Sequence, residues 1–342
     1  MSRDAVQVRP GAQAPGRTDR PPVRKHSPLY RRRTVAAWGF ALPFVVLFVT
    51  FTAGPVLLSF LMALTDLRSR DLRNPLAVEL VGLDNVLAVF ADPLFRKAAA
   101  NTAYFVLVGV PVTLGLSLGI AVLLNSGITR FRTAFRVGYY MPVVTSIVAV
   151  AVVWRFLLQP RTGLINEVLG LVGIEGPNWL ASTTWAMPSL IAMATWRSIG
   201  TLIIIFLAGL QAVPTSLHEA AALDGAGSWQ RFRHITVPTI RPRLLSGAVI
   251  TGIGYLQFFE EPFVMTRGGP LDSTLSVAFY VYNQFGFGNY GYAAAMSYVL
   301  FVAVVVLTLI QFRVLGERDT PRRRWWSRKP SAQPVARQEI GR

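Results

Sequence analysis

The chain has 342 residues, of which 52% are hydrophobic and 15% are charged, with a mean hydropathy of +0.44. Its apolar residues form runs long enough to cross a bilayer core of roughly 30 Å, which excludes an ordinary soluble globular protein. The net charge of +17 is concentrated at the ends, with nine Lys or Arg in residues 1–33 and nine in 313–342, which argues against nucleic-acid binding. Because there is no cysteine, disulfides and thiolate metal sites are excluded.

The first segment, 1–34, is rich in Pro, Arg and Gly and has almost no apolar periodicity. This composition predicts a disordered tail, and the segment is too polar to be a cleaved signal peptide. Six apolar spans follow, which predicts an all-α, polytopic membrane protein. The spans cover about 35–63, 98–124, 137–158, 186–212, 243–266 and 291–316. The membrane domain is therefore 35–316, and 317–342 is a second basic tail.

The orientation follows from the distribution of positive charge between the spans. One set of segments carries nine, three, three and nine Lys or Arg: 1–34, 125–136, 213–242 and 313–342. The alternating set carries five, one and one: 64–97, 159–185 and 267–290. Since cytoplasmic segments carry the excess of Lys and Arg, both termini are predicted to be cytoplasmic.

The three external segments each contain a local signal. Residues 64–97 include a predicted short helix near Pro93–Phe95, and 159–185 include LINEVLG, which predicts a surface or re-entrant helix. The third segment, 267–290, begins RGGPLDST and is expected to cap the outer mouth. No internal repeat is evident, which weakens the case for a secondary transporter built from inverted halves.

A polar insert, 213–242, separates the fourth and fifth spans with the sequence VPTSLHEAAALDGAGSWQRFRHITVPTIRP. Pro214 suits the start of an amphipathic helix, and Asp224–Gly225 ends it because glycine accepts the left-handed conformation. Ser228 is the expected N-cap of a second helix. A thin, alanine-rich helix fits helix-in-groove recognition. The alternative is an amphipathic pair lying on the membrane surface with its arginines toward lipid phosphates.

The charged residues inside predicted spans include Arg155, Arg197, Glu260 and Glu261. Arg155 is close enough to the outer end of its span to snorkel, so a structural role is expected. Arg197 lies about 16 Å into the fourth span, near the midplane, and the two glutamates lie about 7–9 Å from the outer end of the fifth. Ionisable residues at such depth indicate a functional site.

Two interpretations of these charges remain open. Arg197 pairs with Glu260 or with Glu261, which neutralises buried charge. Alternatively the charges form a polar rim for a hydroxyl-rich solute, with Tyr255, Phe258 and Phe259 stacking on a sugar face.

The sequence contains no catalytic or cofactor-binding constellation. A P-loop requires Gly-Lys-Ser/Thr, whereas Lys25, Lys97 and Lys329 each follow arginine. The histidines, His26, His218 and His234, have no metal-ligand spacing around them. We therefore expect no enzyme activity, no cofactor and no metal.

The 213–242 insert closely resembles the EAA loop of permease subunits of binding-protein-dependent ABC importers. The matching residues are Glu219, Ala220, Ala221, Asp224, Gly225, Ala226, Phe232, Ile235 and Pro238. The resemblance extends over about 80–316 and is closest to the carbohydrate-uptake branch, in particular the first sugar permease of the maltose and glycerol-3-phosphate importer type. It is carried by NTAYFVLVGVPVTLGLSLGIAVLLN, TWRSIGTLIIIFLAGLQAVP, FFEEPFVMTRGGPLDST and GYAAAMSYVLF.

The resemblance implies that the chain is half of a sugar-translocating pore in the bacterial cytoplasmic membrane. It implies a second permease subunit, two ABC ATPase subunits that dock on the 213–242 loop, and an extracytoplasmic solute-binding protein. Glu219 would present a charge to the ATPase or cap within the loop, and Gly225 would permit the turn. The alternative is a self-contained secondary transporter or channel, which would need neither the ATPase nor the binding protein.

Overall fold

The computed structural model describes residues 28–74, 78–125 and 132–316, and every regular element in these ranges is helical. The chain divides into two compact units, Met1–Leu58 and Ser59–Arg342. The α-helices are α1 (Pro28–Phe48), α2 (Gly54–Ala63), α3 (Asp84–Ala91), α4 (Pro93–Asn125), α5 (Arg132–Val144), α6 (Ile147–Leu157), α7 (Leu164–Leu171), α8 (Ala186–Gln211), α9 (Thr215–Leu223), α10 (Ser228–Arg231), α11 (Val237–Thr239), α12 (Arg241–Leu256), α13 (Glu260–Met265), α14 (Val277–Gly286) and α15 (Tyr290–Leu315). A 3₁₀ turn covers Ser69–Arg73, and π-helical turns cover Val49–Ala53 and Phe232–Thr236.

Four helical stretches in these ranges are long and apolar enough to cross a membrane. They are Ala36–Ala63, Pro93–Asn125, Ala186–Gln211 and Tyr290–Leu315, and they agree closely with four of the six predicted spans. Helix α1 begins at Pro28, so it overlaps the end of the predicted tail 1–34. Residues 1–27 and 317–342 lie outside the described residues.

The third predicted span is not one continuous helix. The predicted span 137–158 is divided between two helices, since Gly138–Val144 and Ile147–Leu157 meet at 116°. Pro142 precedes the bend and has no N–H to donate, which removes a helical hydrogen bond just before the break. The pair counts as a fifth candidate span if its two parts are taken together.

The fifth predicted span, 243–266, is also interrupted. Helix α12 ends at Leu256 and α13 begins at Glu260, with Gln257–Phe259 between them. Pro262 lacks the N–H that would continue a helix through this point. The interruption leaves α12 as a helix of 16 residues, which is shorter than the spans above.

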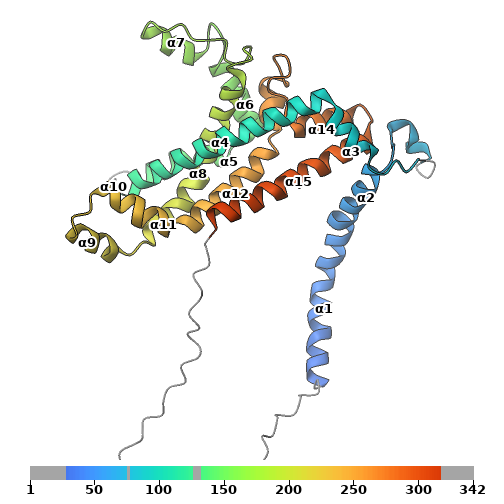
Figure 1. The fold of residues 1–342 in the computed structure, drawn as a ribbon, viewed down its shortest axis with the longest axis horizontal. Coiled ribbons are helices and arrows are strands. Elements are labelled where there is room, and N and C mark those ends of the chain that lie inside the picture. Colours follow the sequence, from blue (N-terminus) through green and yellow to red (C-terminus); the bar gives the residue numbers. More distant parts are fainter. Residues whose placement is uncertain (1–27, 75–77, 126–131, 317–342) are drawn as a thin grey trace, which may run out of the picture. The chain divides into compact units, whose positions relative to one another are not determined.

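In the second unit, α4 packs along α8, and α12 packs against α4 and α15 (Figure 1). Small residues permit the close approach of these helices: a Cβ at Gly109 would lie 2.9 Å from the Tyr255 ring, and one at Gly247 would lie 3.0 Å from the Phe206 ring. Such contacts are typical of helix pairs in membranes, where close van der Waals packing drives association. Figure 1 shows α9 and α10 at one end of this bundle and α3 and α14 at the other.

Candidate functional site

A cavity of about 220 Å³ lies between α5, α8, α12 and α13. Five of the six residues predicted to meet a solute line it: Arg197, Tyr255, Phe258, Glu260 and Glu261. Further polar groups on its wall are Ser198, Thr201, Thr251 and Gln257. The structure therefore brings together residues that are more than 50 positions apart in the sequence, from the middle of α8 and from the break after α12.

Two of the three charged residues of the cavity, Arg197 and Glu261, form only a loose ion pair. Arg197 Nη2 lies 3.9 Å from Glu261 Oε1, and the Glu261 side chain is 4% exposed against 32% for Arg197. One further polar atom of each residue, Arg197 Nε and Glu261 Oε2, is buried and has no hydrogen-bond partner among the described residues. Two residues that line the cavity thus hold a buried donor and a buried acceptor without a protein partner. A hydroxyl can bond to both kinds of group because it donates and accepts.

Tyr255 anchors a chain of hydroxyl groups across three helices. Its hydroxyl lies 2.9 Å from the hydroxyl of Thr113 on α4, which lies 2.9 Å from that of Thr195 on α8. Tyr255 also donates to Ser198 Oγ over 3.4 Å. Sequence reasoning missed Thr113, Thr195 and Ser198, although hydroxyl residues within apolar runs were the available signal.

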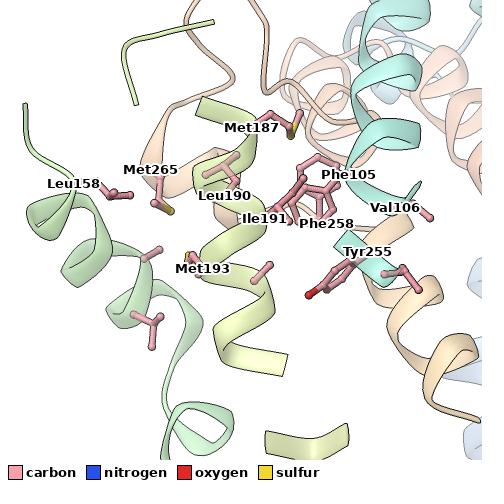
Figure 2. Close-up of a cluster of buried hydrophobic side chains, with 14 residues drawn as sticks. Phe105, Val106, Leu158, Met187, Leu190, Ile191, Met193, Tyr255, Phe258 and Met265 are labelled. Carbon is pink, nitrogen blue, oxygen red and sulfur yellow. The ribbon is translucent and has the colours of Figure 1, made fainter. Parts of the chain in front are cut away.

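The aromatic residues of the prediction separate into two groups. Phe258 is 3% exposed and stacks on Phe105 of α4 at 3.9 Å, with 4° between the ring planes. Figure 2 shows these two rings close to Tyr255. Phe259 is not among the residues that line the cavity; its ring stacks on Phe263 at 5.1 Å and meets Phe279 edge-on at 5.8 Å.

A second candidate surface is the insert 213–242 at the other end of α12. Helix α9 ends at Leu223 and Gly225 has a φ of +79°, as expected for a glycine that closes a helix. The predicted N-cap at Ser228 is wrong by one residue: Gly227 precedes the helix, and its N–H donates to Gln230 Oε1 over 2.8 Å. The glutamine side chain thus bonds the N–H of the N-cap residue itself, which is the half of a capping box that needs no N-cap side chain.

The insert presents apolar side chains outward. Leu223 is 90% exposed and Trp229 70% exposed, and the Trp229 ring stacks on Phe232 at 5.5 Å. The residues predicted to contact the ATPase are accessible as well: Glu219, Ala220, Asp224, Gly225 and Pro238 are exposed, and Ala221, Ala226 and Phe232 are partly exposed. Large apolar side chains that are exposed to solvent on a polar helix pair are typical of a protein-binding surface.

Comparison with known proteins decides the family. Residues 100–316 match the family described as the binding-protein-dependent transport system inner membrane component. The chain belongs to this family. It is therefore a permease component of an ABC importer, in which ATP hydrolysis is the work of a separate subunit.

The sequences of known sugar-system permeases match this permease over most of their length. It is 35% identical to the lactose transport system permease protein LacF of Rhizobium radiobacter, over 85% of this chain and 98% of that protein. It is 32% identical to the arabinooligosaccharides transport system permease protein AraP of Bacillus subtilis, over 84% of this chain and 91% of that protein.

The permease also shares its fold with a solved ABC transporter. A chain of the bacterial alginate ABC transporter, in complex with an alginate pentasaccharide-bound periplasmic protein, matches with a TM-score of 0.73 and 22% identity. The match covers 86% of the permease and 99% of that chain. The likeness confirms an all-helical membrane fold.

Proposed function

We propose that this permease carries a sugar across the bacterial cytoplasmic membrane. Two relatives bear the names of lactose and arabinooligosaccharide systems. The observation that carries the proposal is the Arg197–Glu261 pair, whose Nε and Oε2 atoms are buried without a partner beside a cavity. Sugar hydroxyls would occupy both the donor and the acceptor, and the neighbouring Glu260 carboxylate would accept a further hydroxyl.

Fewer aromatic residues belong to the proposed sugar site than the sequence indicated, because Phe259 does not line the cavity. Because Phe258 is covered by Phe105, one of its faces is already occupied by a ring. Tyr255 is held by hydroxyl groups of α4 and α8. These two side chains form the wall of the proposed site and fix its shape, while Arg197, Glu260 and Glu261 supply its polar contacts.

We infer a six-span topology with both termini in the cytoplasm. The bent pair α5 and α6 would form the third span, and α12 with α13 would form the fifth. The domain limits remain 35–316 for the membrane domain, with basic tails on either side. The excess of Lys and Arg in the segments around α9 and α10 supports their cytoplasmic side.

The insert 213–242 would dock the ATPase. Leu223 and Trp229 supply the apolar contacts, and Glu219 supplies a charge on the same short helix pair. The complete importer would contain this permease, a second permease subunit, two ATPase subunits and an external solute-binding protein.

Gly225→Val tests this docking role. A β-branched residue is strained at a φ of +79°, and no atom lies within 4 Å of the added Cβ, so the substitution acts through the turn and not through a clash. We expect the variant to lose ATPase subunits on co-purification, or to retain them and transport sugar at least about tenfold more slowly per ATP hydrolysed.

The matched control is Gly173→Val. Gly173 has a φ of +76° and equally open surroundings, but it lies in the segment 159–185 on the proposed outer side. The control should keep its ATPase and its coupling. If wild-type protein retains no ATPase and vesicles holding this chain alone still transport the solute, the protein is a secondary transporter.

A further inference from the structure

A second polar cavity, of about 450 Å³, lies at the end of the bundle where Figure 1 shows α3 and α14. Its wall comes from the segment after α2, from α3, from α14 and from the start of α15. It shares no lining residue with the cavity beside Arg197. We call it the outer cavity, and the cavity beside Arg197 the inner cavity.

Helix α4 separates the outer cavity from the inner one. Asp92 lines the outer cavity and directly precedes α4, whereas Thr113 bonds to Tyr255 of the inner cavity. Thr113 lies about 20 residues further along the helix, which is roughly 30 Å at 1.5 Å per residue. Because Thr113 is near the middle of its span, this distance places the outer cavity beyond the hydrocarbon core, on the side assigned to 64–97 and 267–290.

Hydrogen bonds to the backbone fix the wall of the outer cavity. Asn85 Nδ2 donates to the carbonyl oxygens of Ala63 at 2.9 Å and Thr65 at 2.7 Å. The Gly291 N–H donates to the Leu67 carbonyl oxygen over 2.9 Å. These bonds tie the segment after α2 to α3 and to α15, so the cavity has its shape before any ligand enters.

Several side chains on this wall keep hydrogen-bonding capacity. Within the described residues, the Arg68 guanidinium has no hydrogen bond or ion pair, and it can only donate. Asp66 accepts the Glu79 N–H with Oδ1 alone. Asn85 and Asn289 bond to neighbouring groups through their amide N–H groups, which leaves their Oδ1 atoms as acceptors. Donors and acceptors on one wall match hydroxyl groups, which accept and donate.

We propose that the outer cavity is a second sugar site, which holds a monosaccharide or disaccharide outside the membrane core before the sugar reaches the inner cavity. Its volume of about 450 Å³ falls within the usual range for small-molecule sites and is about twice that of the inner cavity. The proposal rests on the proposed sugar transport and on the external side of 64–97 and 267–290.

The composition of the wall favours a sugar over an ion. In the parts of the chain that the structure describes, no three His, Asp or Glu side chains converge as a metal ion would require. The carboxylates of Asp66 and Asp92 lie on the same wall as Arg68 and disfavour an anion. The partly exposed Tyr292 supplies an aromatic ring for the apolar face of a sugar.

Photolabelling of the complete importer in lipid nanodiscs tests the outer site. The probes are diazirine derivatives of lactose and of an arabinose disaccharide, the sugars in the names of two relatives' systems. Labelled peptides are identified by mass spectrometry. We expect adducts in 64–92 or 280–292, and an excess of the unmodified sugar should displace them.

Arg68→Ala removes the free donor of the outer site. Loss of a charge-assisted hydrogen bond should reduce the outer adduct by about tenfold or more. The matched control is Arg70→Ala, because Arg70 is exposed in the same external segment, pairs with Asp71 and does not line the cavity. Both Arg70→Ala and the inner-cavity variant Glu260→Gln should keep the outer adduct. All three variants should retain their ATPase subunits.

The outcomes distinguish the outer site from the importer function. The proposal is overturned by the absence of outer adducts, by adducts that excess sugar does not displace, or by equal outer labelling in wild type and Arg68→Ala. It is also overturned if Arg70→Ala loses the adduct as fully as Arg68→Ala. A wild-type preparation that holds no ATPase instead refutes the proposed importer function, whatever the outer cavity binds.

Discussion

At the scale of single residues, the Arg197–Glu261 pair combines burial with poor contact. A separation of 3.9 Å exceeds hydrogen-bond length, while the carboxylate is almost fully withdrawn from solvent. The Coulomb attraction of such a pair offsets its desolvation only if hydrogen bonds complete the geometry. This geometry supports the proposed contact between the pair and a polar solute.

Two single substitutions and their combination measure this balance. Glu261→Gln leaves the Arg197 charge without a counter-charge, and Arg197→Gln leaves the buried Glu261 carboxylate unpaired, so each should lower thermal stability. The loss should be larger for Arg197→Gln, because Glu261 is the more buried partner. The double variant should regain most of the stability.

Sugar uptake separates the structural role of the pair from solute contact. If the pair contacts the solute, the double variant is stable and fails to transport. A stable double variant with normal uptake would show that the pair only neutralises buried charge.

The sequence predicted these residues because a charge near the midplane of a membrane requires an explanation. It left two partners open for Arg197, since the choice depends on how the chain turns after Leu256. The break at Gln257–Phe259 places Glu261 within 3.9 Å of Arg197. The burial of Phe258 depended on Phe105, which lies far away in the sequence and could not be paired with it by pattern.

At the scale of helices, Asp92 connects three elements at one end of the bundle. Its Oδ2 accepts from the hydroxyl groups of Tyr280 on α14 at 2.6 Å and Tyr292 on α15 at 2.9 Å. Its Oδ1 accepts from the Leu94 N–H at 2.8 Å, which caps the start of α4. One carboxylate therefore ties the beginning of α4 to α14 and α15.

This connection predicts a loss of stability in acid. Burial alone would raise the pKa of Asp92, but hydrogen bonds from Tyr280, Leu94 and Tyr292 together lower it below the ordinary 3.8. A depressed pKa gives a contribution that is present above the unfolded-state value and is lost as the pH falls through the folded-state value. Thermal unfolding in detergent should therefore show a stability loss below about pH 4.

Asp92→Asn is the control for this effect. The variant should unfold at a lower temperature near neutral pH and show a shallower decline in acid. An acid decline as steep as that of the wild type would assign the effect to other carboxylates.

Helix boundaries were predictable where an apolar run is long and unbroken. The fourth span was expected at 186–212 and α8 covers Ala186–Gln211; the sixth was expected at 291–316 and α15 covers Tyr290–Leu315. The bend near Thr145 and Ser146 escaped prediction because both of its arms are apolar. The hydropathy of a segment indicates whether it lies in lipid or in water, but it does not indicate where the helix bends.

At the scale of the whole molecule, the orientation in the membrane can be measured directly because the chain has no cysteine. Glu175 and Ser216 are both exposed, in segments predicted to lie on opposite sides. In intact cells, a membrane-impermeant maleimide should label Glu175→Cys and leave Ser216→Cys unreacted until the membrane is opened. Labelling of Ser216→Cys from outside would reverse the topology and place the docking surface away from ATP.

Helix α12 connects the two proposed functional regions. It begins at Arg241, next to the insert 213–242, and ends at Leu256, beside the cavity. A helix of 16 residues is about 24 Å long, and each residue turns it by about 100°. Inserting one residue would therefore swing Tyr255 away from Thr113 even if both ends kept their sequences, so α12 should tolerate exchanges of side chains far better than any change in its length.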